Sequence, residues 1–233
     1  MEQQNQVGKY EILNTVNSPA DIKKLDRNQL VQLSQEIRDK IIEVVSKNGG
    51  HLGGPLGAVE LTMAVHYVFD APKDKIIFDT GHQCYPHKLI TGRRDNFNTL
   101  RQYKGVCGFC NIQESEYDVF GAGHASTAIS AAFGIAKARD YKKEDYQVVA
   151  IVGDGALTAG LSFEGLNNLG ASKTDMLIIL NDNRMSISPN VGAISNYLNK
   201  IVVKPGYFKL RKTTKELLQR IPGIGEEELD KVF

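Results

Sequence analysis

The stretch Val148-Val149-Ala150-Ile151-Val152-Gly153-Asp154-Gly155 joins a continuous apolar run to a glycine-rich turn. Five consecutive apolar residues are typical of a central parallel strand that helices cover on both faces. A second apolar run, Met176 to Leu180, follows a segment that predicts a helix over about residues 158–169. Strand, helix and strand predict a βαβ unit, and we expect the second strand to be buried like the first.

The sequence on the N-terminal side of this unit continues the alternation of helices and strands. Apolar residues at helical spacing follow Asp26 and stop at Gly49-Gly50. The other expected elements are a helix start at Ser18, a helix over residues 58–69, a short strand at 76–78, an irregular surface excursion over 91–123 and a helix over 125–141. The predicted fold class is α/β, with a mainly parallel sheet and helices on both faces. Residues 1–17 are expected to be an N-terminal extension, and residues 18–233 one domain.

Composition excludes several classes of protein. The chain has 28 Lys+Arg and 27 Asp+Glu, a net charge of +1, which argues against binding to nucleic acid. No apolar run approaches the ~20 residues that span a bilayer, and the polar N-terminus lacks the features of a secretory signal. Three cysteines, an odd number, argue against a disulfide framework. We expect a cytoplasmic protein without a membrane partner.

Polar triplets follow both apolar strands of the βαβ unit, Gly153-Asp154-Gly155 and Asn181-Asp182-Asn183. Ligands of open α/β sheets bind outside the carboxyl ends of the strands, and adjacent strands would place the triplets side by side. The carboxylate of Asp154, the amide oxygen of Asn183 and a backbone carbonyl near Met185 are hard oxygen ligands that suit Mg²⁺. Either triplet alone is more simply explained as a turn. Together, each after an apolar strand, they favour a metal and diphosphate site.

These triplets resemble the thiamine diphosphate fingerprint. Further segments narrow the resemblance: His51-Leu52-Gly53, Gly81-His82-Gln83-Cys84-Tyr85-Pro86-His87-Lys88, Gly123-His124-Ala125-Ser126-Thr127, and the run from Asn181 to Ala193. Together they resemble the N-terminal domain of the 1-deoxy-D-xylulose-5-phosphate synthase family, which is transketolase-like. The resemblance extends from about residue 20 to the C-terminus. General transketolases share the triplets but lack the 83–88 and 185–188 runs.

The resemblance implies roles for individual residues. Asp154, Asn183 and the carbonyl of Met185 would bind Mg²⁺, and Gly155, Ala156 and Asn183 would contact the cofactor diphosphate. Gly123, His124 and Ala125 would line the cofactor pocket. His82 would reach the cofactor near its reactive carbon, and His51 would carry protons.

The resemblance also implies a reaction and partners. The family joins pyruvate to glyceraldehyde 3-phosphate with loss of carbon dioxide, in the synthesis of isoprenoid, thiamine and pyridoxal precursors. The cofactor supplies the carbanion chemistry. Family subunits pair, so we expect a homodimer. Family members carry two further domains, one of which supplies the glutamate that activates the cofactor. We therefore expect this chain to be inactive without C-terminal domains or a partner subunit.

Three positions depart from the family pattern. Ala125 and Gly54 stand where many relatives have serine, and Ile112 where an arginine is common. The loss of that arginine raises the question of how the loop around residue 112 is anchored.

Two other functions remain open from the sequence. One is the N-terminal subunit of a split transketolase, and the other is a non-catalytic fragment that binds a partner. Of the remaining candidate residues, His66 and His87 are expected to be structural. The spacing of Cys107 and Cys110 is that of a metal or redox pair, but a single pair is weak grounds for a zinc site.

Overall fold

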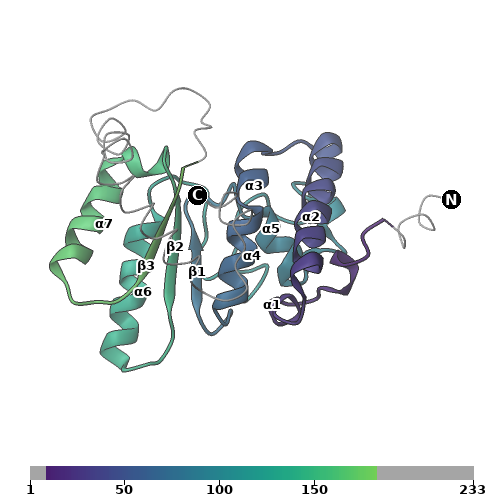
Figure 1. Cartoon of the computed structure of the whole chain (residues 1–233). Helices are drawn as coiled ribbons and strands as arrows, with labels where there is room; N and C mark the ends of the chain where they lie inside the picture. Colours follow the sequence, from purple (N-terminus) through teal and green to yellow (C-terminus); the bar gives the residue numbers. More distant parts are fainter. Residues whose placement is uncertain (1–8, 183–233) are drawn as a thin grey trace, which may run out of the picture. The chain divides into compact units, whose positions relative to one another are not determined.

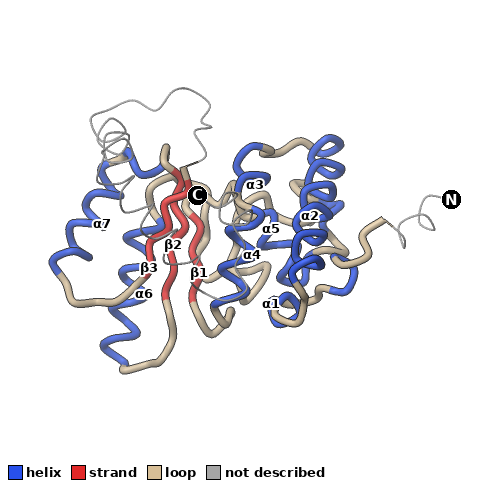
Figure 2. The backbone as a smooth tube through the Cα atoms, in the orientation of Figure 1, coloured by secondary structure: helices blue, strands red, loops and turns tan. Residues whose placement is uncertain are grey.

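A computed structural model describes residues 9–182, all within the first of two compact units, Met1–Ile187. Its centre is a parallel sheet of three strands in the order β1-β2-β3 (Figures 1 and 2). The strands are β1 (Lys75–Phe78), β2 (Val148–Gly153) and β3 (Leu177–Asn181). The predicted α/β class and parallel sheet are confirmed.

Helices connect and cover the strands. In chain order the α-helices are α1 (Pro19–Ile22), α2 (Arg27–Asn48), α3 (Gly53–Gly57), α4 (Val59–Val68), α5 (Tyr85–Lys88), α6 (Ala128–Lys142) and α7 (Gly160–Ala171). Short 3₁₀ turns are η1 (Leu13–Thr15), η3 (Phe97–Thr99) and η4 (Ala156–Thr158), and η2 (Leu89–Arg93) is a π-type turn.

Local signals explain where the longest helix, α2, begins and ends. The carboxylate of Asp26 accepts the N–H of Gln29 at 2.9 Å, and the Gln29 side chain accepts the N–H of Asp26, which forms a capping box. The helix ends at Gly49, whose φ of +74° favours glycine. The predicted helix after Asp26 is confirmed.

The two faces of the sheet pack against different helices. Ile76 and Phe78 of β1, with Val149 and Ile151 of β2, belong to the core that includes residues of α2 and α4. Alternate strand residues such as Ile77 point to the opposite face, because successive side chains of a strand alternate. There α6 contacts β1 and β2 and packs against α7. In Figure 1, α6 and α7 lie on one side of the sheet and α1 to α5 on the other.

Three expectations need revision or addition. Strand β3 is half-exposed rather than buried, with Leu177 44% and Leu180 39% accessible, because none of the described helices packs as closely on it as α6 does on β1 and β2. The helix expected from residue 125 begins at Ala128, since Ser126 has a φ of +74°. Residues 10–16 lie ahead of the expected domain start, yet Leu13 is fully buried in the core.

The segment over residues 91–123 is largely irregular, as predicted, but it is not simply a surface excursion. Val106, Cys110 and Asp118 are buried. Val106 and Cys110 belong to the hydrophobic core, and Asp118 belongs to the ion network described below. Within residues 9–182, no helix combines the length and apolar character needed to cross a membrane.

Candidate functional site

The carboxyl ends of the three strands meet at one edge of the sheet, where the polar triplets were predicted. Gly153 pairs with Asn181 in the β2–β3 register, and the N–H of Asp154 donates to the carbonyl of Asn181 at 3.2 Å. The predicted proximity is therefore confirmed up to Asn181. Asn183 and Met185, the other expected metal ligands, lie outside the described residues.

A buried glutamine ties the strand ends together. Gln83 donates from Nε2 to the carbonyl of Ile151 at 3.4 Å, and its Oε1 accepts Nδ2 of Asn181 at 3.4 Å. The loop after β1 is thereby joined to the ends of β2 and β3. Gln83 was part of the sequence resemblance, but no sequence signal gave it this role.

The segments expected to contact the cofactor lie around this edge. Gly123, His124 and Ala125 are exposed, and a Cβ added at Gly123 would meet no atom within 4 Å. The carbonyl of Ala156 accepts two hydroxyls, Oγ of Ser126 at 2.6 Å and Oγ of Ser162 at 3.1 Å. The 123–125 segment and the Gly155–Ala156 turn are thus joined through Ser126.

Asp79, directly after β1, is an important residue that the sequence analysis did not single out. Its side chain is fully buried, and its two oxygens accept the N–H groups of Ser126 at 2.7 Å and Ala128 at 3.2 Å. A carboxylate at these amides satisfies donors at the start of α6 and is favoured by the helix dipole. The signal that could have identified it is an acid that follows an apolar strand directly.

The two histidines expected to be catalytic lie together. The ring centroids of His51 and His82 are 5.5 Å apart in an edge-to-face arrangement, and Phe109 lies 6.0 Å from His51 on another side. The Nδ1 atoms of both histidines are buried without a hydrogen-bond partner. Such unpaired polar atoms in a native fold call for an explanation, and a site for a polar ligand is one.

Both histidines favour their neutral form. Burial, with the charge of Arg101, lowers the pKa of His51 below its ordinary 6.5. Burial lowers the pKa of His82, with a contribution from His51 that the Asp79 charge opposes. Neutral imidazoles carry one N–H and one lone pair each, so near neutral pH either ring can donate or accept a proton.

Gly54, where the sequence resemblance led us to expect a serine, lies against His82 of this pair. A Cβ at residue 54 would be 2.6 Å from Cδ2 and 2.8 Å from Nε2 of His82. The His82 ring therefore occupies space that a side chain at residue 54 would need.

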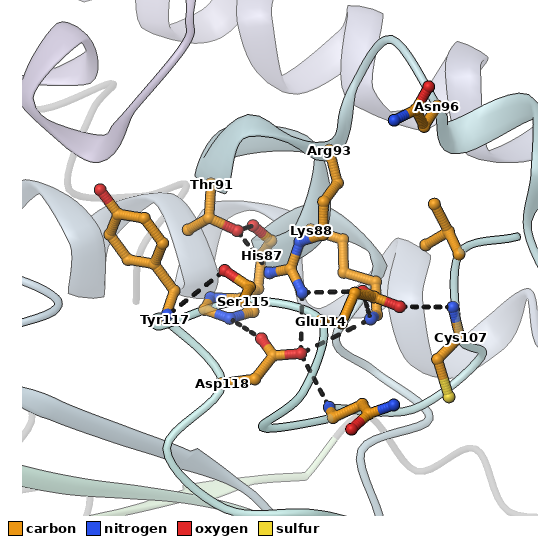
Figure 3. Close-up of polar contacts among 12 residues, drawn as sticks. His87, Lys88, Thr91, Arg93, Asn96, Cys107, Glu114, Ser115, Tyr117 and Asp118 are labelled. Atoms are coloured by element: carbon orange, nitrogen blue, oxygen red, sulfur yellow. Dashed lines mark hydrogen bonds and ion pairs between the residues drawn. The ribbon is translucent and has the colours of Figure 1, made fainter.

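A second group of polar residues is buried except for Glu114, whose side chain is 17% exposed. We call it the buried ion network; it comprises His66 and five residues labelled in Figure 3, His87, Lys88, Arg93, Glu114 and Asp118. Nη1 of Arg93 contacts Oε1 of Glu114 at 2.9 Å and Oδ2 of Asp118 at 2.7 Å. Lys88 pairs with Glu114 and lies 3.6 Å from Asp118. The charges of Lys88 and Arg93 thus balance those of Glu114 and Asp118.

Hydrogen bonds fix the tautomers of the two histidines in this network. Burial alone would raise the pKa of Asp118, but hydrogen bonds from His87 and Arg93 and the charge of Arg93 hold it well below its usual range. The ionised Asp118 accepts from Nε2 of His87 at 2.9 Å, so Nδ1 of His87 is an acceptor. Nε2 of His66 then donates to that Nδ1 at 2.8 Å. Both histidines are buried and neutral, which supports the structural role expected for them.

The buried ion network also anchors the loop around Ile112, where the sequence resemblance led us to expect an arginine. Oε2 of Glu114 accepts the N–H of Cys107 at 2.6 Å, and Oδ2 of Asp118 accepts the N–H of Asn111 at 2.8 Å. Ile112 itself is 62% exposed. Anchoring of this loop therefore does not depend on residue 112.

Three ligand-type side chains, His87, Cys110 and Asp118, come within 4.8 Å of one another. Their arrangement does not favour a metal. Both ring nitrogens of His87 and both oxygens of Asp118 already have partners, and two cations lie beside them. A hydrogen bond with Cys84 and burial raise the pKa of the Cys110 thiol, which disfavours the thiolate that metals bind. Cys107 is not a member of this group.

The described residues at the sheet edge fit the metal and diphosphate end of a cofactor. Asp154 offers a hard oxygen ligand at the tip of β2, next to the tip of β3. The exposed 123–125 segment and the half-buried Gly155 leave backbone accessible beside it. The unpaired Nδ1 atoms of His51 and His82 supply polar groups that a bound molecule could satisfy.

Comparison with known proteins identifies the family. The family model described as 1-deoxy-D-xylulose-5-phosphate synthase matches residues 13–232. The 1-deoxy-D-xylulose-5-phosphate synthase of Syntrophus aciditrophicus is 59% identical over 219 residues, 94% of this chain and 34% of the relative. That of Caldanaerobacter subterraneus is 57% identical over 215 residues, 92% of this chain and 35% of the relative. The chain thus spans about a third of the length of these curated relatives. It belongs to the 1-deoxy-D-xylulose-5-phosphate synthase family.

Proposed function

We propose that residues 18–233 form the domain that binds Mg²⁺ and the diphosphate of thiamine diphosphate in a transferase of the transketolase type. The complete enzyme condenses pyruvate with glyceraldehyde 3-phosphate, with loss of carbon dioxide, for isoprenoid, thiamine and pyridoxal precursors. This chain acts with C-terminal domains or a partner subunit and is inactive alone.

The observation that carries the proposal is the convergence of polar loops at one sheet edge. The Asp79 to His82 loop, the Gly153-Asp154-Gly155 turn and Asn181 end three neighbouring parallel strands. Open α/β sheets bind their ligands at such an edge.

Each residue of the site has a task in this proposal. Asp154 gives a carboxylate oxygen to the metal, with Asn183 and the Met185 carbonyl as further ligands. Gly155 and Ala156 contact the diphosphate. When bound, thiamine diphosphate supplies the carbanion chemistry that decarboxylation and condensation require.

The histidines and the 123–125 segment act nearer the reacting atoms. Gly123, His124 and Ala125 line the pocket, His82 contacts the cofactor, and His51 holds or releases a proton close to the substrate. Their neutral state suits this task because a neutral imidazole can accept a proton and return it.

Calorimetry of the 233-residue chain tests the proposal. We expect thiamine diphosphate to bind only when Mg²⁺ is present, and Asp154→Ala to weaken binding at least tenfold. Asp145→Ala is the matched control, since it removes an exposed carboxylate at the opposite end of β2 and should leave binding unchanged. Absence of binding at millimolar thiamine diphosphate with Mg²⁺ would instead favour the non-catalytic fragment.

The remaining parts of the proposal concern the whole enzyme. We propose a cytoplasmic homodimer. The family match favours a part of a 1-deoxy-D-xylulose-5-phosphate synthase over the N-terminal subunit of a split transketolase. Mixing the chain with a candidate C-terminal partner, and offering pyruvate or a ketose donor, distinguishes the two. Transfer of a two-carbon unit from the ketose would contradict our assignment.

A further inference from the structure

The carboxylate of Asp79 accepts three hydrogen bonds at the candidate site, although the proposed chemistry does not use it. Its backbone N–H donates to the carbonyl of Ile151 at 2.8 Å and so extends the β1–β2 ladder. Its carboxylate accepts the N–H groups of Ser126 and Ala128, and the hydroxyl of Thr80 at 3.2 Å. The side chain is 0% exposed.

These contacts hold the backbone in a conformation that it would not adopt unaided. Ser126 has a φ of +74° and Thr80 a φ of +57°, both in the left-handed region that disfavours residues with a Cβ. Such conformations persist when the surrounding structure imposes them, and they are concentrated at functional sites. Both strained residues donate to the same oxygen of Asp79, Oδ1, while Oδ2 accepts the N–H of Ala128.

Ser126 links the 123–125 segment to the turn after β2. Its hydroxyl donates to the carbonyl of Ala156 at 2.6 Å, next to Gly155. A single buried carboxylate is therefore connected to three segments: the loop that carries His82, the 123–125 segment that leads into α6, and the Gly155–Ala156 turn.

We infer that Asp79 is the positioning residue of the site: its carboxylate fixes the 123–128 segment and, through Ser126, the Gly155–Ala156 turn, in the arrangement that receives the cofactor. This inference rests on the proposed function for the identity of the ligand, but the constraint on the two segments can be tested without any ligand.

Asp79→Asn is the sharpest substitution. The size of the side chain is kept, but one acceptor oxygen becomes an NH₂ group that faces a backbone donor. Asp74→Asn is its matched control. Asp74 is also buried, lies immediately before the same strand, and accepts two backbone N–H groups, of Asp70 at 2.7 Å and Gln147 at 2.7 Å. It lies at the opposite end of the sheet from the site.

We would measure amide hydrogen exchange of the 233-residue chain for both variants, with their free energies of unfolding. We expect Asp79→Asn to speed exchange at least tenfold in residues 123–128 and 154–157, beyond any global loss of stability. Asp74→Asn should not do so. Ser126→Ala removes only the link to Ala156, so it should speed exchange in 154–157 and leave the amide of Ala128 protected. Equal exchange in the two aspartate variants over these segments would overturn the inference.

Two further measurements separate a positioning role from a merely structural one. Titration of His82 by NMR should give a lower pKa in Asp79→Asn than in the wild type, because the Asp79 charge opposes the lowering, and an unchanged pKa in Asp74→Asn. Calorimetry with thiamine diphosphate and Mg²⁺ should show affinity at least tenfold weaker in Asp79→Asn alone. If the wild-type chain binds no cofactor, the proposed function fails, and the exchange result still decides the role of Asp79.

Discussion

The chain contains two pairs of adjoining histidines with opposite surroundings. His51 and His82 meet edge to face at the sheet edge, partly exposed, and within residues 9–182 neither is hydrogen-bonded to a carboxylate. His66 and His87 are stacked in the interior, and Asp118 fixes the orientation of their protons. Both pairs are neutral, but only the internal pair has its protons assigned by a fixed acceptor.

The difference shows how the same side chain serves structure or chemistry. A buried histidine hydrogen-bonded to a carboxylate that is itself held by Arg93 has little freedom to exchange protons with a ligand. Nδ1 of His51 and of His82 is buried and unpaired, but so are Nδ1 of His66 and Nε of Arg93 in the interior. The fixed acceptor Asp118 and the full burial of His66 and His87, rather than unpaired atoms, therefore separate the internal pair from the pair at the candidate site.

The largest expected effect is on the internal pair. Asp118→Asn removes the anion that compensates Arg93 and Lys88 and orients His87, and loss of one partner of a buried ion pair costs about 3–5 kcal/mol. We expect a loss of that size in the free energy of unfolding, measured by urea denaturation. Asp95→Asn, at an exposed acid that pairs with Arg94, serves as the control and should leave stability unchanged. Equal free energies of unfolding for Asp118→Asn and Asp95→Asn would contradict the expectation that the buried ion network stabilises the fold more than a surface ion pair does.

The pH dependence of stability should come mainly from the same pair. Burial, with nearby positive charges, lowers the pKa of His66 well below 6.5, and burial lowers that of His87. Below pH 6.5 the unfolded chain therefore takes up protons that the folded chain does not, so stability is full above that pH and falls as the solution is acidified. Each histidine that stays neutral contributes about 1.4 kcal/mol per pH unit to the decline.

His66→Gln tests this contribution, since its side-chain amide can still donate to His87. We would measure the free energy of unfolding by urea denaturation between pH 7 and pH 5. We expect its slope against pH to be smaller in His66→Gln than in the wild type, by the equivalent of about one proton. His51→Gln, in the partly exposed pair, should change the slope less. A larger change of this slope in His51→Gln than in His66→Gln would contradict the expectation that the internal pair dominates the pH dependence of stability.

The sequence predicted the strands and the sheet edge better than the buried ion network, for physical reasons. The strands and α2 were predicted because apolar periodicity and capping residues are local signals, and Gly153-Asp154-Gly155 was placed at a strand end on the same grounds. The buried ion network joins residues as far apart as His66 and Asp118, and no local pattern indicates such pairings. The exposure of β3 was also missed, because an apolar run alone does not reveal how closely helices pack on the strand.

A smaller effect is expected at Gly54, which lies against His82 of the partly exposed pair. Gly54→Ala places a methyl group 2.6 Å from the His82 ring, so the ring must move. We expect overpacking to cost about 1–2 kcal/mol, and the NMR signals of His82 to shift while those of His87 stay unchanged. Gly134→Ala is the control: open space surrounds that position in α6, so the substitution should stabilise the helix by about 0.5–1 kcal/mol. Unchanged His82 signals in Gly54→Ala would show that the ring does not depend on that space.

The smallest perturbation is a titration of the wild-type chain, which compares all four rings at once. His51 and His82 are partly accessible to water, and burial lowers their pKa without preventing protonation. Protonation of His66 or His87 would place a charge inside a network whose cations and anions already balance. Histidine NMR should therefore show His51 and His82 titrating below pH 6.5, and His66 and His87 keeping their neutral signals until the chain unfolds. Thiamine diphosphate with Mg²⁺ should shift the signals of the first pair only. A ligand-dependent shift confined to His66 and His87 would place the site at the other histidine pair.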